Sequence, residues 1–471
     1  MRDPPAGAPG RLRGGGQKGG LATAFERELA AEIEALLGPG ALEGLDFEAI
    51  ETAARRRALR VAARAVERHL NADRSDHVGP ALRCACGRQA RYVGRRPRTF
   101  STALGEMTLE RAAYHCAACG SGFYPRDRAL GLVDTSLSPA ITRMVGRAAA
   151  MVSFAESSEL MGELAGIPVD AKQVERTAEA LGREIAADER SVVEPEAPPA
   201  PTMYLGMDGT GIPMRAAELE GRAGKQPDGS ARTREVKLVT VWTAEGRDAE
   251  GIPVRDSGSV SYSAAIESAA SRDTDAAPSE FARRAEREAQ RRGFDVAARR
   301  VVLGDGATWI WNLAGEQFGG AVEIVDLFHA KHHLSDVAKA IYGPANDLGR
   351  EWARQRHDEL DDGRLDALCD ALRVHVGASD EARRCLDYIT RNASRMRYPE
   401  FRANGLCVSS GVVEAGCKVA IGTRLKRAGM HWTLAGADAI IALRCCKLSG
   451  RFEDFWERRS AGADGAAGAA G

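Results

Sequence analysis

The sequence predicts a multidomain α/β protein, and three observations lead to this class. The chain has 471 residues, too many for one ordinary hydrophobic core, so about two to four domains are expected. Its first part is mostly helical in pattern, apart from a basic segment that contains two cysteine pairs. After a proline-rich stretch, short apolar runs rich in β-branched residues alternate with helical segments, which is the pattern of an α/β domain.

The first residues predict disorder followed by two helices. Residues 1–20 are rich in Gly, Pro and Arg, so we expect them to be disordered rather than to form a secretory signal peptide. Residues 21–76 have the periodicity of two amphipathic helices joined at residues 38–40. No apolar run is long enough to span a bilayer, and the 10 cysteines are not spaced as a secreted disulfide framework. We therefore expect a cytoplasmic protein that has no contact with a membrane.

Residues 77–130 have the pattern of a zinc ribbon. Four cysteines form two pairs, each followed by a glycine: Cys84, Cys86, Cys116 and Cys119. The segment between the pairs alternates like a strand hairpin, and four thiolates at such a hairpin are the ligands that tetrahedral Zn²⁺ requires. A single residue separates the first pair, where zinc ribbons usually have two, so His77 or His115 could replace one ligand. Buried cysteines without a metal are the alternative.

The same segment is basic, although the whole chain has a formal net charge of -1. From Arg83 to Arg128 the sequence has nine arginines against three acidic residues. A basic module in a nearly neutral protein indicates a polyanionic partner that only this part of the chain contacts. For any single arginine, a solvated side chain is the alternative.

Residues 134–190 predict helices with sharp breaks between them. A short helix, a turn at residues 166–169 and a following helix capped by Asp170 are typical of a helix-turn-helix. A small helical bundle with solvated charges would give the same pattern. On the DNA-binding interpretation, the side chains that face DNA are Lys172, Gln173 and Arg176.

A proline-rich linker is expected next, and a region of strands follows it. Residues 191–201 cannot continue a helix, so a domain boundary is expected there. Residues 202–330 contain three strands that can form an antiparallel meander, then a helix, a strand, a second helix and a final strand. The strands are expected near residues 203–214, 235–242, 259–263, 301–304 and 322–325. This order is that of the ribonuclease H-like fold, whose sheet is mixed.

Three acids lie in or directly after these strands: Asp208, Asp305 and Asp326. In a ribonuclease H-like sheet the first strand is central, the fourth pairs with it, and the fifth lies beyond the fourth. Because neighbouring strands are roughly 5 Å apart, Asp208 and Asp305 can share two metal ions about 4 Å apart. Asp326 is one strand further away, so we expect it to support the site. Carboxylate ligands favour Mg²⁺ or Mn²⁺.

A third carboxylate is expected on a helix in residues 406–459, the second part of this domain. Glu414 lies in the first turns of a helix that two serines precede, and Lys418 follows one turn later on the same face. Residues 331–405 then form a charged helical insertion, and residues 460–471 form a disordered Ala/Gly tail. Taken alone, Glu414 would be explained better as an exposed glutamate near a helix N-terminus.

As a set, these motifs resemble the DDE transposases of bacterial insertion sequences, close to the Kra branch and related to the Mutator-like group. The resemblance extends from about Cys84 to Trp456 and includes the cysteine pairs. Its most specific motifs are residues 207–211, 303–307, 326–329 and 410–432.

The resemblance implies a chemistry and the residues that perform it. Asp208, Asp305 and Glu414 would form the catalytic triad, with Asp326 and His329 beside it. With Mg²⁺ or Mn²⁺ bound, water would cleave the DNA at an element end, and the freed 3′-hydroxyl would then attack target DNA. Contacts to phosphates are expected from Lys418, Arg424, Lys426 and Arg427, although an exposed basic helix face is the plainer interpretation of these residues.

The implied partner is double-stranded DNA, both at the terminal repeats of the element and at the target. A homodimer or higher oligomer is expected because two element ends must be processed together. The expected location is the bacterial cytoplasm, on the nucleoid when the protein is active. Two alternatives stay open. One is a DNA-binding regulator whose catalytic domain has decayed, and the other is a structure-specific nuclease of the same fold that never joins strands.

Overall fold

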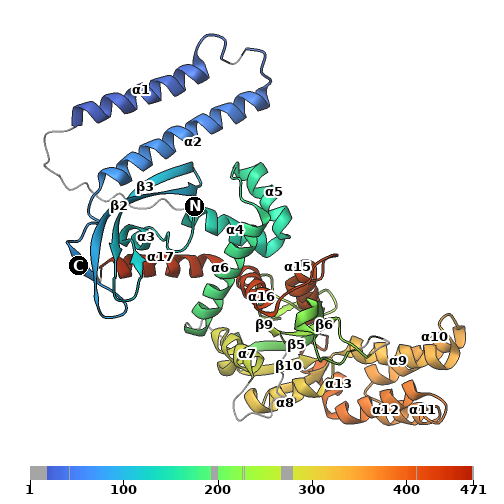
Figure 1. Ribbon diagram of the computed structural model, residues 1–471. Helices are drawn as coiled ribbons and strands as arrows, with labels where there is room; N and C mark the ends of the chain where they lie inside the picture. Colours follow the sequence, from blue (N-terminus) through green and yellow to red (C-terminus); the bar gives the residue numbers. More distant parts are fainter. Residues whose placement is uncertain are drawn as a thin grey trace. The chain divides into compact units, whose positions relative to one another are not determined.

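The computed structural model describes residues 18–191 and 200–468, apart from residues 42, 225, 227–228, 267–278 and 410. Most of the expected disordered N-terminus and most of the expected linker therefore lie outside the described residues. The chain divides into two compact units (Figure 1): unit 1 contains Met1–Thr142 and Ser460–Gly471, and unit 2 contains Arg143–Arg459. None of the described helices is long and apolar enough to cross a membrane.

Unit 1 begins with a helical hairpin and continues into a small antiparallel sheet. The helices are α1 (Lys18–Leu37) and α2 (Phe47–Ala72). In sheet order the strands are β1 (Ala81–Arg83), β2 (Gln89–Thr102), β3 (Gly105–His115) and β4 (Gly122–Phe123), and the short helix α3 (Pro125–Ala129) follows them. Asn71 joins α2 to β3, because its side chain donates to the Thr108 carbonyl and accepts from the Glu110 N–H.

Three arginines of the basic segment are paired inside unit 1 rather than exposed to a partner. Arg95 contacts Asp76 at 2.9 Å, and Arg111 contacts Asp127 at 2.5 Å. Arg126 also contacts Asp76, at 3.3 Å. Arg111 and Arg126 are only 3% and 5% exposed. Their ion pairs help to hold the sheet and α3 together. Fewer arginines of this segment are therefore available to bind a polyanion than the sequence indicated.

Three helices follow where the sequence predicted a helix-turn-helix. They are α4 (Pro139–Met151), in which unit 2 begins, α5 (Phe154–Ala165) and α6 (Ala171–Ser191). Ser153 and Glu156 form a reciprocal capping box at the start of α5, and Gly166, with a φ of 69°, ends it. Asp170 caps α6 by accepting a hydrogen bond from the Gln173 N–H at 2.9 Å.

The helix α6 shares a core with a helix near the end of the chain. At Gly182 it packs so closely on α16 (Leu434–Leu448) that an added Cβ would lie 2.0 Å from the carbonyl oxygen of Ala439. The sequence predicted a domain boundary after α6. The structure instead places α6 in the same compact unit as the following sheet, because its apolar face is covered by a segment far away in the sequence.

Unit 2 is built on a five-stranded mixed sheet in the order β11-β10-β5-β6-β9. Its strands are β5 (Thr202–Pro213), β6 (Thr233–Thr243), β9 (Ser261–Ile266), β10 (Arg299–Gly304) and β11 (Val322–Val325). β5 is central: it runs antiparallel to β6 and parallel to β10, and β11 lies beyond β10. These are the relative positions that the sequence predicted for the first, fourth and fifth strands.

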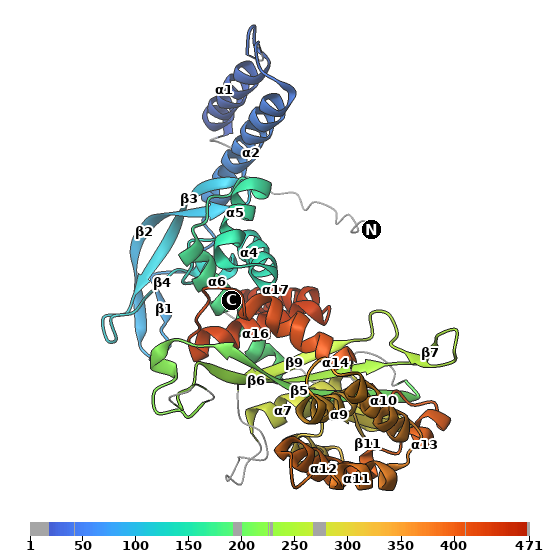
Figure 2. The same cartoon turned by 90° about the vertical axis from the view of Figure 1, so that its right-hand side faces the viewer.

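Helices cover both faces of this sheet (Figure 2). One face carries α7 (Glu280–Arg291) and α8 (Thr308–Gln317), and the other carries α14 (Gly411–Gly416), the π-helix η5 (Cys417–Gly422), α15 (Thr423–Leu425) and α16. Side chains alternate along a strand, so Gly206 and Asp208 of β5 point to the same face. An added Cβ at Gly206 would lie 2.0 Å from Cγ2 of Val413, which shows that this is the face with α14.

The helical insertion lies between β11 and α14, and its helices group together (Figure 2). They are α9 (Leu327–Tyr342), α10 (Asp347–Asp361), α11 (Leu365–Arg373), α12 (Asp380–Asn392), η4 (Ala393–Arg395) and α13 (Tyr398–Ala403). Smaller elements elsewhere in unit 2 are η1 (Ala216–Glu218), β7 (Gly246–Arg247), β8 (Pro253–Val254) and η3 (Phe294–Val296).

The last helix, α17 (Phe452–Gly468), differs from the sequence prediction. Residues 460–471 were expected to be a disordered tail, but the chain stays helical through Gly468. The alanines of this tail favour a helix and its glycines oppose one, so intrinsic propensity alone does not explain the helix.

Candidate carboxylate and zinc sites

The fold places Asp208 and Asp305 on neighbouring strands. In the parallel register of β5 and β10, Met207 lies beside Gly304, and the two aspartates are the next residues of the two strands. Burial raises the pKa of Asp208, and the negative charge of Asp305 adds to this effect. The Cys417 thiol and the Gly209 N–H, which donates to Asp208 Oδ1 at 2.7 Å, act in the opposite direction. The two acids thus form a like-charge pair at the carboxyl end of β10.

The helix that carries Glu414 is fixed to the same face of the sheet. Val413 packs on Gly206, two residues before Asp208 in β5. One turn after Glu414, the Cys417 thiol interacts with the Asp208 carboxylate, and the charge of Asp208 adds to the effect of burial in raising the pKa of Cys417. Residues three apart share a helix face, so Glu414 projects from the face that meets Asp208. Ser410, part of the cap expected before this helix, lies outside the described residues.

Glu414 is accessible and pairs with a lysine on its own helix. Its side chain is 67% exposed and contacts Lys418 Nζ at 2.6 Å. The hydrogen bond and charge of Lys418 lower the pKa of Glu414, and the charge of His329 contributes further. The sequence prediction of a shared face for Glu414 and Lys418 is confirmed, and the glutamate remains ionised at neutral pH.

Asp208 and Asp305 interact through their charges, but the three carboxylates are not gathered at the distances of a single coordination sphere. Among the residues that the structure describes, one group of three or more His, Cys, Asp or Glu side chains has all its ligand atoms within 4.8 Å, and it consists of four cysteines. The donor chemistry nevertheless suits a hard divalent cation, because a cation would relieve the repulsion between Asp208 and Asp305.

Asp326 and His329 lie beside this pair at the start of the insertion. Asp326 caps α9, because its Oδ1 accepts from the His329 N–H at 2.5 Å, and its own N–H donates to the Gly304 carbonyl at 2.8 Å. The Asp326 side chain therefore serves as the N-cap of α9, directly after β11. The charge of His329 acts on both Asp208 and Glu414, which places its ring near the carboxylates.

The expected phosphate contacts have different environments. Lys418 and Lys426 are exposed, and Lys426 Nζ donates to the Thr210 hydroxyl on the Asp208 face of β5. Arg427 is half-buried and forms an ion pair with Glu156 of α5, with one N–O distance of 2.6 Å.

Arg424 is a correction to the sequence prediction. Its side chain is 0% exposed, its Nε donates to the Ala149 carbonyl of α4 at 2.9 Å, and its guanidinium lies over the rings of Phe154 and Trp432. Arg424 therefore ties α15 to α4 and α5 and is not available to a phosphate. A basic run in a sequence does not reveal which of its members points inward.

The three residues expected to face DNA lie at the start of α6. Lys172 is exposed and pairs with Glu175 at 2.7 Å, and Arg176 is also exposed. Gln173 is half-buried, and its N–H is used in capping. Lys172 and Arg176 thus retain access to a partner, while Gln173 has a structural role through its backbone.

Sequence reasoning missed two residues that contact the carboxylate strands. The Cys417 thiol interacts with the Asp208 carboxylate and acts to lower the pKa of that carboxyl group, and its position one turn after Glu414 was the only signal in the sequence. Tyr388 of α12 donates its hydroxyl to the carbonyl of Asp305 at 2.9 Å. No local pattern could reveal Tyr388, because 83 residues separate it from Asp305.

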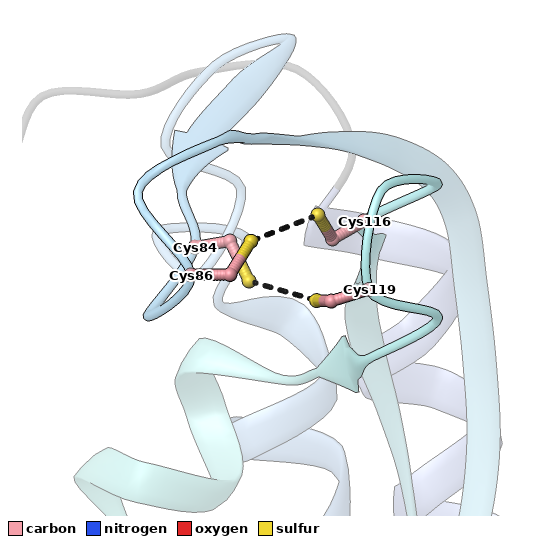
Figure 3. Close-up of side chains that lie close together, drawn as sticks. All are labelled: Cys84, Cys86, Cys116 and Cys119. Carbon is pink, nitrogen blue, oxygen red and sulfur yellow. Dashed lines mark hydrogen bonds between the residues drawn. The ribbon is translucent and has the colours of Figure 1, made fainter.

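The four cysteines of unit 1 come together as the sequence predicted (Figure 3). The Cys84 and Cys119 sulfurs are 3.6 Å apart, as are those of Cys86 and Cys116. A tetrahedron with Zn–S bonds of about 2.3 Å has edges of about 3.8 Å, so four sulfurs all within 4.8 Å of one another could hold a zinc ion. The short spacing of the first pair does not displace a ligand, and the ring of His77 packs against Tyr92.

Local backbone geometry explains how the cysteine pairs converge. Gly87 and Gly120 adopt φ values of 82° and 72°, which turns each loop back after its pair. The hydroxyl and N–H of Ser121 lower the pKa of the Cys119 thiol to about 6. A thiolate at neutral pH is the form that binds a metal.

Comparison with known proteins gives a weak structural likeness. No protein-family model and no curated protein sequence matches the chain. Among solved structures it is similar to the Drosophila P element transposase strand transfer complex, with 10% sequence identity and a TM-score of 0.23. The similarity covers 67% of this chain and 80% of that chain. At this level a shared fold is not established, and this chain's own residues carry the functional conclusion.

Proposed function

We propose that the protein is a DDE transposase of a bacterial insertion sequence, with a ribonuclease H-like catalytic domain in unit 2. The observation that carries this proposal is the pairing of Asp208 and Asp305 on adjacent parallel strands. The helix of Glu414 packs on the same face through Val413. The resemblance of these motifs to the transposase family supports the assignment, and so does the strand order β11-β10-β5.

In this proposal Asp208, Asp305 and Glu414 hold Mg²⁺ or Mn²⁺. Two such ions, when bound, stabilise both the attacking and the leaving oxygen of a phosphodiester. Asp208 is held in place by Cys417 and the Gly209 N–H. The exposed ammonium groups of Lys418, beside Glu414, and of Lys426, at Thr210, bind the DNA phosphates.

Water first cleaves the strand and frees a 3′-hydroxyl, and that hydroxyl then attacks target DNA. The exposed Lys172 and Arg176 of α6 contact double-stranded DNA at the element ends. Two or more copies act together because two ends are joined, and the four cysteines of unit 1 hold a structural zinc ion.

The test is strand cleavage by purified full-length protein on double-stranded DNA taken from the flanks of the coding sequence, with Mg²⁺ or Mn²⁺. Asp208→Asn, Asp305→Asn and Glu414→Gln should each lower the cleavage rate by about 100-fold or more while DNA binding is kept. Glu400→Gln is the matched control, because Glu400 is also an exposed helical glutamate in an ion pair, with Arg397.

Products of the same assay separate the alternatives. Joined strands support a transposase, whereas cleavage without joining indicates a structure-specific nuclease. Specific binding without cleavage by the wild type indicates a DNA-binding regulator. If Glu414→Gln cleaves normally and Asp326→Ala does not, the assignment of the third carboxylate is wrong.

A further inference from the structure

Two tyrosines of the helical insertion bind the ends of the parallel strands that precede the acids. Tyr388 of α12 donates its hydroxyl to the carbonyl of Asp305, directly after β10, at 2.9 Å. Tyr398, the first residue of α13, donates to the carbonyl of Val325, the last residue of β11, at 3.1 Å. Both rings are buried, with exposures of 8% and 0%.

The contact between Tyr388 and the Asp305 turn is close. Gly306 has a φ of 97°, and a Cβ added there would lie 2.4 Å from the Tyr388 ring. The ring also packs against His333, at 4.5 Å between ring centroids. The Tyr388 hydroxyl acts as the donor to the backbone carbonyl of Asp305.

Asp305 is thus held at its side chain and at its backbone. Its carboxylate oxygen Oδ1 accepts from the Ala307 N–H at 2.9 Å, and its backbone carbonyl accepts from the Tyr388 hydroxyl. Only one of these two bonds uses a carboxylate oxygen, so the Asp305 side chain keeps lone pairs for a metal ion. A hydrogen bond that fixes a ligand-bearing residue commonly changes metal affinity about 10- to 100-fold.

We propose that Tyr388 is a positioning residue for Asp305, through which the helical insertion sets the metal-binding geometry of the carboxylate site. This inference rests on the proposed function. Tyr398 provides an internal contrast. It supports the carbonyl before Asp326, whose side chain is used as a helix cap, so Tyr398 contributes to the fold without setting metal affinity.

The experiment compares Tyr388→Phe, Tyr398→Phe and Tyr342→Phe in the full-length protein. Each change removes one hydroxyl and keeps the ring. Tyr342 is the matched control, since it is a half-buried tyrosine of the same insertion that packs by its ring against Trp352 and His375. The readout is Mn²⁺ binding measured by electron paramagnetic resonance, with and without bound DNA, together with thermal unfolding.

Tyr388→Phe should weaken Mn²⁺ binding about 10-fold, and Tyr398→Phe and Tyr342→Phe should bind Mn²⁺ as the wild type does. Wild-type Mn²⁺ binding by Tyr388→Phe overturns the inference. Equal weakening by Tyr398→Phe also overturns it, because the effect would then come from general loosening of the insertion. If the wild type binds no Mn²⁺ in either condition, or Asp305→Asn binds it normally, the proposed metal site itself fails.

Discussion

Asp208 is half-buried, and its surroundings disfavour the charged form of its carboxyl group. Burial and the neighbouring Asp305 raise its pKa, while its partners Cys417 and Gly209 only partly offset this effect. Groups of this kind cluster at functional sites, where activity is kept at the expense of stability. The charged Asp208 side chain is therefore expected to be required for catalysis and to lower the stability of the fold.

Asp208→Asn should raise the melting temperature of unit 2 at pH 7 in buffer without divalent cations. A carboxyl group whose pKa is higher in the folded state than in the unfolded state lowers the free energy of unfolding as it ionises. The lowering begins near the pKa of the unfolded state, about 3.9, and is complete above the pKa of the folded state. Asparagine cannot ionise, so the higher melting temperature of the variant should be present at pH 7 and should vanish near pH 3. Tryptophan fluorescence follows unit 2 selectively, because all 6 tryptophans lie in it. An unchanged or lower melting temperature at pH 7 would contradict the expected penalty.

At the scale of single elements, the cysteine loops of unit 1 show how a spacing rule can mislead. The first pair has one intervening residue, yet both of its sulfurs join the four-cysteine group. The loop achieves this with a turn in which the Gly87 N–H donates to the Cys84 carbonyl at 2.9 Å. Ligand geometry depends on the whole loop, and counting residues between cysteines captures only part of it.

Wild-type protein should contain about one zinc ion per chain, measured by mass spectrometry after exhaustive dialysis. Cys86→Ser and Cys116→Ser should each lose the zinc and lower the melting temperature of unit 1, followed by far-UV circular dichroism, by on the order of 10 °C. His77→Ala should keep the zinc. Retention of zinc by Cys86→Ser with loss in His77→Ala would mean that the histidine is the fourth ligand.

Local patterns predicted the strands and their order but not the contacts between distant segments. The apolar runs that became β10 and β11 are short and rich in valine, which is the pattern of strands buried on both faces. The burial of Arg424 and the hydroxyl bond of Tyr388 depend on partners 275 and 83 residues away. The hydrophobic periodicity of one helix or strand does not predict which distant residues will contact it.

At the scale of the whole molecule, unit 2 is held together by helix packing between the first and last parts of its sequence. Gly182 of α6 lies against the backbone of α16 at Ala439. Arg444 of α16 is 3% exposed and donates to the Ala420 carbonyl of η5 at 2.8 Å. The predicted DNA-binding helices and the helix of Glu414 therefore belong to one packed core.

Gly182→Ala should destabilise unit 2 by about 1–3 kcal/mol, because the added methyl group collides with the Ala439 backbone. Gly162→Ala is the matched control: Gly162 is in α5, and an added Cβ there would meet no atom within 4 Å. This control should stabilise the protein by up to about 1 kcal/mol. Chemical unfolding followed by tryptophan fluorescence measures both. Equal effects of the two changes would show that α6 does not depend on α16.

The packing of α6 on α16 has a consequence for synthesis on the ribosome. Proteins are made from the N-terminus, and a helix whose apolar face is uncovered cannot complete its fold until its partner emerges. α6 and the strands that carry Asp208 and Asp305 are made long before Glu414 and α16. In the proposed transposase, a nascent chain would thus be unable to cut DNA until almost all of unit 2 has been translated.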